Sequence, residues 1–115
     1  MIKRETFTIA SAGTASNALA GQGYRLTGLV LPALDSTTIG FQYSPDNVTF
    51  STIYTNSGAT AAVTLGNADT GSKAQAVPDE VGKLSAVGFI KLVTAAQNGG
   101  ARTIGSVWER VGSPN

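Results

Sequence analysis

Large apolar residues recur at every second position in short runs of this chain, and Gly, Pro, Asn and Asp separate the runs. Residues 37–44, TTIGFQYS, carry Ile39, Phe41 and Tyr43 at alternate positions. A period of two places such side chains on one face of a β-strand. Runs of this kind predict seven or eight short strands, the candidates being Glu5–Ala10, Tyr24–Leu31, Thr37–Ser44, Thr49–Thr55, Ala61–Leu65, Lys73–Val77, Gly88–Thr94 and Arg102–Val111.

Helical patterns are short. The segment Pro78–Gly82 (PDEVG) predicts one helical turn, because proline suits the first position of a helix, acidic residues favour its first turn and glycine follows its end. The small-residue segment Ala15–Ala20 predicts at most a further helical turn. No run longer than these two has the 3.6-residue period of an amphipathic helix.

Short strands at roughly 8–12-residue spacing are typical of a two-sheet sandwich. We therefore predict one all-β domain over residues 1–115, an antiparallel two-sheet β-sandwich that is jelly-roll-like or Greek-key-like. A chain of this length buries roughly two-thirds of its unfolded surface, so a single core suffices. Residues 1–5 lead into the first expected strand, and we predict that they form an N-terminal arm.

Charge is sparse in this chain. Charged residues make up 13% of it, with a net charge of +1, and the usual fraction is about 25%. The basic residues are scattered rather than clustered, so we expect no nucleic-acid partner. The polar surface is built mainly from Ser, Thr, Asn and Gln, whose burial costs less than burial of a charge. This composition favours a protein whose surface is in contact with other proteins.

Histidine and cysteine are both absent. Their absence removes the usual general base, the thiol nucleophile and the commonest metal ligands. The carboxylates fall mostly in expected loops and caps, and no nucleophile, base and orienting group occur together in a recognisable pattern. We expect no enzyme activity, no cofactor and no metal.

The first residues, MIKRETFTIASAG, lack the 7–15-residue apolar core of a signal peptide. No stretch approaches the ~18 apolar residues of a membrane span. We expect no membrane partner, and a protein that is made in the cytosol and leaves it only when a particle carries it out.

The sequence Ser44-Pro45-Asp46-Asn47 lies between two aromatic-bearing runs. Serine at the first position, proline at the second and aspartate at the third predict a type I turn. A calcium site would need several more oxygen ligands at fixed spacing. We interpret the segment as a turn whose exposed tip, Asp46 and Asn47, is available for contacts.

The few aromatic residues with polar groups could serve either packing or binding. Exposed aromatics build glycan platforms and interface hot spots, whereas aromatics in strands usually pack in the core. We predict core positions for Trp108, Tyr24, Tyr43 and Tyr54, because each falls in an expected strand.

Several expected segments follow one another in a recognisable order. An apolar strand ends in proline, an aromatic hairpin with a Ser-Pro-Asp turn follows, and a Phe-Ile-Lys-Leu strand and an Arg-Thr-Ile strand come later. The residues concerned are Leu29–Pro32, Ile39–Ser44, Phe50–Tyr54, Val77–Val81, Phe89–Leu92 and Arg102–Ile104. In this order they resemble a family of small structural proteins from tailed bacteriophages, the capsid decoration or cement proteins.

The resemblance implies a β-sandwich that binds the outer surface of the virion shell, with the major capsid protein as partner. It also implies a symmetric homo-oligomer, often a trimer. Candidate capsid or subunit contacts are Ile2, Lys3 and Arg4 in the expected arm, and Asp46 and Asn47 at the turn. The alternative is a carbohydrate-binding module or phage tail adhesin, in which loop tips or aromatic faces meet glycans.

Overall fold

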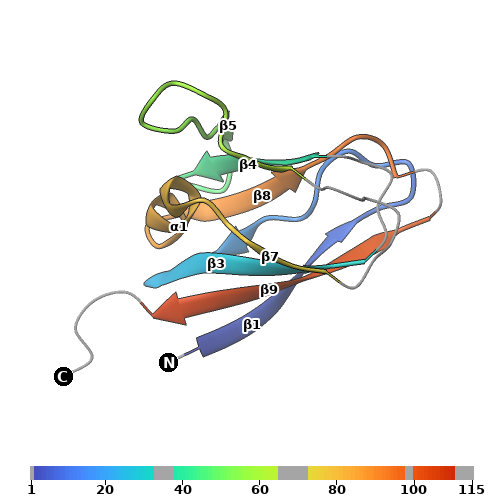
Figure 1. Cartoon of the computed structure of the whole chain (residues 1–115), viewed down its shortest axis with the longest axis horizontal. Helices are drawn as coiled ribbons and strands as arrows, with labels where there is room; N and C mark the ends of the chain where they lie inside the picture. The colour runs from blue at the N-terminus through green and yellow to red at the C-terminus, as the bar shows by residue number, and fades with distance from the viewer. Residues whose placement is uncertain (1, 33–37, 65–72, 98–99, 111–115) are drawn as a thin grey trace.

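The computed structural model describes residues 2–32, 38–64, 73–97 and 100–110. These residues form two antiparallel sheets and one short helix, so the predicted all-β sandwich is confirmed (Figure 1). The elements are β1 (Ile2–Ile9), β2 (Leu19–Ala20), β3 (Tyr24–Leu31), β4 (Thr38–Ser44), β5 (Ser51–Thr52), β6 (Ala62–Thr64), β7 (Lys73–Ala76), α1 (Asp79–Ser85), β8 (Phe89–Val93) and β9 (Arg102–Arg110).

The strand order is that of a jelly roll. Sheet A has the order β1-β9-β3-β7, and sheet B has the order β2-β8-β4-β5. The first four strands alternate between the two sheets. Both β5 and β6 pair with the same edge of β4, β5 at Gln42 and Tyr43 and β6 from Thr38 to Gly40. Together β5 and β6 therefore occupy the position of one interrupted edge strand.

The interruption between β5 and β6 is a side loop, Tyr54–Thr60, that leaves the sheet edge and returns to it. At its base the Ile53 amide donates to the carbonyl oxygen of Phe41, and the Ala61 amide donates to that of Ile53. Within the side loop the Thr55 amide donates to the Ala59 carbonyl oxygen. Of the expected strand Thr49–Thr55, only the two residues Ser51–Thr52 form a strand.

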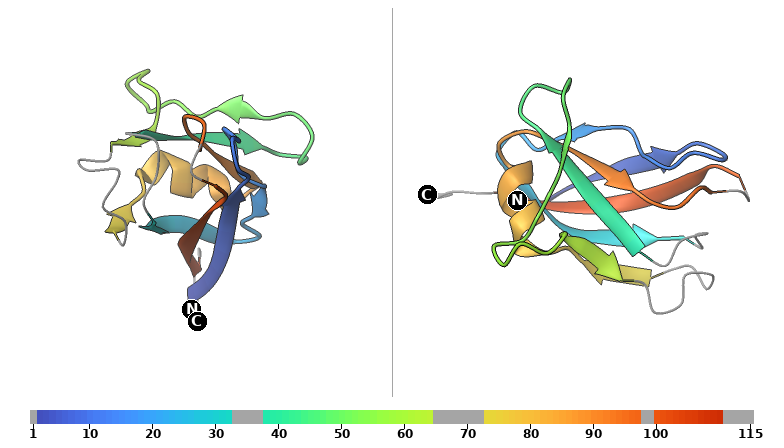
Figure 2. Two further views of the ribbon diagram at one scale, coloured as in Figure 1. Left: turned by 90° about the vertical axis from the view of Figure 1, so that its right-hand side faces the viewer. Right: turned by 90° about the horizontal axis from the view of Figure 1, so that it is seen from above.

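The core fills the space between the sheets. Alternate residues of the long strands, such as Phe7 and Ile9 in β1 and Ile39 and Phe41 in β4, face inward and are buried, as their spacing predicts. Helix α1 lies between the two sheets at one end of the sandwich (Figures 1 and 2). The buried apolar residues are Phe7, Ile9, Leu26, Leu29, Leu31, Ile39, Phe41, Ile53, Ala61, Val63, Val77, Val81, Ile90, Leu92, Ile104 and Trp108.

The predicted N-terminal arm is wrong for residues 2–5, which belong to β1. Ile2 lies opposite Glu109, and Glu5 lies opposite Ser106, in an unbroken register with β9. Because β9 is nine residues long, it offers a pairing partner to every residue of β1 from Ile2 onward. Residue 1 lies outside the described residues.

Two local predictions also need correction. Residues 15–20 form no helical turn, because Ala15 bridges to Val93 and Leu19–Ala20 pairs with β8. The helical turn expected over Pro78–Gly82 continues to Ser85. Gly82 does not end the helix; its missing side chain instead lets α1 approach the backbone of β3, where an added Cβ would lie 3.1 Å from the Leu26 carbonyl oxygen.

Candidate functional site

The outer side of sheet A carries a nearly uncharged surface, which we call the A face. The strand registers place its residues in two rows across all four strands. One row is Thr6, Gly105, Val30 and Ala74, and the other is Arg4, Val107, Gly28 and Ala76. All but Arg4 are small, apolar or hydroxyl residues, so the A face is the candidate functional site.

Val30 forms a ridge on the A face. Its side chain is 50% exposed and lines a shallow hollow on each side. One hollow, of about 260 Å³, extends over β1 and β9, and the other, of about 310 Å³, extends over β3 and β7. Glycine at positions 28 and 105 leaves space beside the ridge, since an added Cβ at Gly105 would lie 3.4 Å from the Val30 Cβ.

The charges near the A face lie at its border. Arg25 Nη2 and Glu109 Oε1 are 3.5 Å apart, and both side chains are largely exposed. A pair so exposed contributes little to stability. Arg4 lies opposite Val107 on the edge strand β1 and lines, with Glu5, the hollow over β1 and β9. Among the described residues, the hollow over β3 and β7 has no charged residue in its lining, so the surface from Val30 to β7 can be dehydrated without stripping water from a charge.

The structure separates the two groups of residues that the sequence offered as contacts. Ile2 and Arg4 are exposed on the outer side of β1, whereas Asp46 and Asn47 lie in the turn that follows β4 in sheet B. The five residues therefore do not form one cluster. Arg4 alone among them is in the rows of the A face.

Lys3 faces the inside of the sandwich. Its Nζ donates to the carbonyl oxygens of Ala20 and Gly21, at 3.1 and 3.3 Å. It also lies 2.8 Å from Glu5 Oε2 and 4.9 Å from the ring centroids of both Trp108 and Tyr24. These contacts hold the side chain on the inner side of β1, at the end of the core. Lys3 as a capsid or subunit contact stays a prediction.

The Ser44–Asn47 segment is a turn held by its aspartate. Asp46 Oδ1 accepts hydrogen bonds from the Ser44 hydroxyl at 2.8 Å and from the amides of Val48 and Thr49 at 2.9 and 3.2 Å. Asn47 has a φ of 63°, a conformation that asparagine tolerates well. The carboxylate is engaged by the turn itself, and the exposed Asn47 remains a contact candidate.

The same hydrogen bonds lower the pKa of Asp46 below its usual value of 3.8, with the Val48 amide as the largest cause and the Ser44 hydroxyl next. A lowered pKa stabilises the turn above pH 3.8, and this contribution is lost as the pH falls through the folded-state pKa. A carbon-detected NMR titration of the Asp46 carboxyl should give a midpoint below 3.8. A midpoint at or above 3.8 would contradict the hydrogen bonding.

The aromatic residues follow the core prediction with one exception. Trp108 is fully buried, and Tyr24 and Tyr43 are partly buried against the core. Tyr54 is 60% exposed, because Ile53 takes the inward position where the side loop leaves the sheet. The prediction of a core position for Tyr54 is wrong, and among the described aromatics no exposed row of rings forms a glycan platform.

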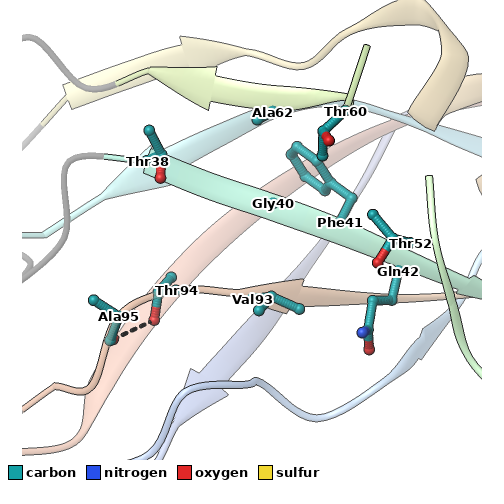
Figure 3. A pocket seen from close by; sticks show the side chains of 10 residues that line it. All are labelled: Thr38, Gly40, Phe41, Gln42, Thr52, Thr60, Ala62, Val93, Thr94 and Ala95. Atoms are coloured by element: carbon teal, nitrogen blue, oxygen red, sulfur yellow. Dashed lines mark hydrogen bonds between the residues drawn. The ribbon is translucent and has the colours of Figure 1, made fainter. Parts of the chain in front are cut away.

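The outer side of sheet B has its own hollow, of about 310 Å³. Figure 3 shows Gly40 of β4 near its middle, between Ala62 of β6 and Val93 of β8. Thr38, Thr52, Thr60 and Gln42 add neutral polar groups to its lining. This hollow resembles the A face in its small, uncharged residues but lacks a raised apolar ridge.

Across the described ranges, no three acidic side chains are close enough together to hold a metal ion. Nor does any helix in that part of the chain have the length and hydrophobicity to cross a membrane. No protein-family model, curated protein or solved structure matches the chain.

Sequence reasoning missed the A face. Its side chains come from four strands that are far apart in the sequence, and the alternation in each strand shows only that they share a face. The glycines inside two expected strands, Gly28 and Gly105, were the available indication, since glycine in a strand often marks close approach by another group.

Proposed function

We propose that this chain is a non-enzymatic structural protein of a tailed bacteriophage, which binds the outside of the capsid shell through its A face and stabilises the shell. The observation that carries the proposal is the exposed Val30 ridge on a four-stranded, almost uncharged sheet face. The cores of protein interfaces are apolar and depleted of charge, as this face is.

The partner comes from the resemblance to capsid decoration proteins. The sandwich supplies a rigid body, and its A face supplies a surface that a second protein can cover at low desolvation cost. The proposed partner is the major capsid protein, and the proposed location is the outer surface of the virion. A symmetric homo-oligomer would present several copies of the A face at once, so that weak contacts add through avidity.

The direct test is to mix the purified chain with undecorated capsids and to count the copies bound per particle. Saturation at a copy number that matches a symmetry axis of the shell would support the proposal. Absence of binding, or binding that never saturates, would overturn it.

The substitution Val30→Glu should reduce capsid occupancy at least tenfold. It places a carboxylate in the middle of the A face, and an unpaired charge is costly to bury in an interface. Val30 is half exposed, so the isolated protein should tolerate the change. Occupancy is measured by quantitative electrophoresis of sedimented capsids.

Val87→Glu is the matched control. Val87 is 69% exposed and lies between α1 and β8, away from the A face. Val87→Glu and Val30→Glu both replace an exposed valine by a negatively charged residue. Equal occupancy losses for both variants would show that the A face has no special role.

A further inference from the structure

The outer edge of β1 is covered along only part of its length. β1 is the first strand of sheet A and pairs with β9 alone. At its C-terminal end the Thr8 amide donates to Asn17 Oδ1 at 2.7 Å, and the Asn17 amide donates to the Thr8 carbonyl oxygen at 3.3 Å. Ile9 also bridges to Ser16. From Thr8 onward, this edge is therefore occupied.

The edge from Ile2 to Thr6 is different. Backbone groups in an antiparallel strand point alternately to its two sides. Because the amide and carbonyl of Thr8 point away from β9, those of Thr6, Arg4 and Ile2 do so as well. In the described part of the chain no strand adjoins them, and an unpaired strand edge is a template for another strand.

We propose that this edge pairs with the same edge of a second copy of the chain, antiparallel, with Arg4 opposite Arg4 of the second copy. Ile2 of each copy then lies opposite Thr6 of the other, so all three free positions are used. A shift by two residues in one direction places Ile2 opposite Thr8, which Asn17 already occupies. A shift by two in the other direction leaves Thr6 without a partner.

The charges on the inner side of β1 favour the same register. Lys3 and Glu5 are already 2.8 Å apart within one chain. With Arg4 at the centre, Lys3 of each copy lies opposite Glu5 of the other, so that four charges alternate in sign. The shifted registers place Glu5 opposite Glu5, or Lys3 opposite Lys3, and like charges opposite each other are destabilising.

One charge opposes the pairing. Arg4 meets Arg4 of the second copy on the outer side, where each side chain is exposed and can extend into water. The two A faces then lie on the same side of one continuous sheet. Such a pair has two-fold symmetry, so it gives a dimer and not the trimer that the family resemblance implies.

Sedimentation equilibrium on the untagged chain at micromolar concentrations tests the proposal. The expected result is reversible association to twice the chain mass of 11.7 kDa. The substitution Thr6→Pro should yield a monomer, because it removes an amide that points away from β9, where an edge strand tolerates proline. Thr6→Val, which keeps that amide, should remain dimeric. A wild-type monomer or trimer at all concentrations would overturn the proposal.

Two further variants test the register and do not depend on proline being tolerated. Glu5→Lys makes all four inner charges positive and should raise the dimer dissociation constant at least tenfold. Arg4→Thr removes the one repulsive pair and should lower that constant. Near-ultraviolet circular dichroism checks that each variant is folded. A weaker dimer for Arg4→Thr, or an unchanged one for Glu5→Lys, would contradict the register.

Discussion

Replacing Trp108 by alanine should lower the free energy of unfolding by about 3–5 kcal/mol, the usual range for removing a large buried aromatic. Trp108 is 0% exposed and stacks against Phe7, with ring centroids 6.4 Å apart. Its Nε1 donates to Ser106 Oγ at 2.8 Å. The substitution leaves a cavity between the sheets and removes both contacts.

The loss also reaches Lys3, whose Nζ lies 4.9 Å from the Trp108 ring centroid. The Lys3 amine keeps its hydrogen bonds to the Ala20 and Gly21 carbonyl oxygens, so it stays at the end of the core. The space that the Trp108 ring filled beside it becomes a cavity.

Urea unfolding followed by far-ultraviolet circular dichroism measures the effect, since the only tryptophan is removed. Trp108→Phe is the control: it keeps a ring against Phe7, loses the Nε1 hydrogen bond and should cost less than half as much. A loss below about 1 kcal/mol for Trp108→Ala would be far under the range for buried aromatics and would show that Trp108 is not in the core.

The parts of the fold that could be predicted depend on local patterns. The alternation of Ile39 and Phe41 with Gly40 and Gln42 assigns one face of β4 to the core, and the structure buries both apolar residues. Tyr24–Leu31 was predicted with the bounds that the structure gives to β3. In a strand with one buried face, every second residue indicates which face packs in the core.

The start of β1 could not be predicted from local pattern alone. Residues 2–5 contain two basic residues and one acidic residue, which suits an exposed arm, and they are a strand only because β9 extends alongside them. The alternation nevertheless held a clue: Lys3 and Glu5 share the phase of Phe7 and Ile9. Extending that phase would have placed Lys3 on the inner side, where the structure has it.

The A face depends on information that a single strand does not hold. Val30, Gly105 and Ala74 become neighbours only through the pairing of β3 with β9 and β7. The exposure of Tyr54 also depends on strand pairing. Tyr54 begins the side loop, which leaves the sheet between β5 and β6, and both of these strands pair with one edge of β4. Each requires the order of strands in the sheet, which apolar alternation does not specify.

A second large effect is expected at Gly21, between β2 and β3. A Cβ added there would lie 1.7 Å from the Ser85 carbonyl oxygen and 2.8 Å from that of Tyr24. Both obstacles are backbone atoms, which cannot rotate away as a side chain can. Gly21→Ala should therefore cost about 3 kcal/mol or more, at or above the upper end of the usual range for overpacking.

The cost should be large because Gly21 joins three parts of the fold. Its amide donates to the Gly88 carbonyl oxygen at 3.0 Å, and its carbonyl oxygen accepts from the Tyr24 amide at 3.1 Å. Moving Gly21 away from Ser85 would strain both bonds and shift the end of α1. The same carbonyl oxygen also accepts from Lys3, so the end of the core should loosen as well.

Gly40→Ala is the matched control for Gly21→Ala. The nearest atom to an added Cβ at Gly40 is the Val93 carbonyl oxygen at 3.8 Å, an ordinary contact. Alanine at a compatible backbone position usually stabilises by about 0.4–1 kcal/mol, because it restricts the unfolded chain. Thermal unfolding should therefore show a large fall in Tm for Gly21→Ala, and an unchanged or slightly raised Tm for Gly40→Ala. Equal shifts in the two variants would mean that α1 does not approach Gly21 as closely as described.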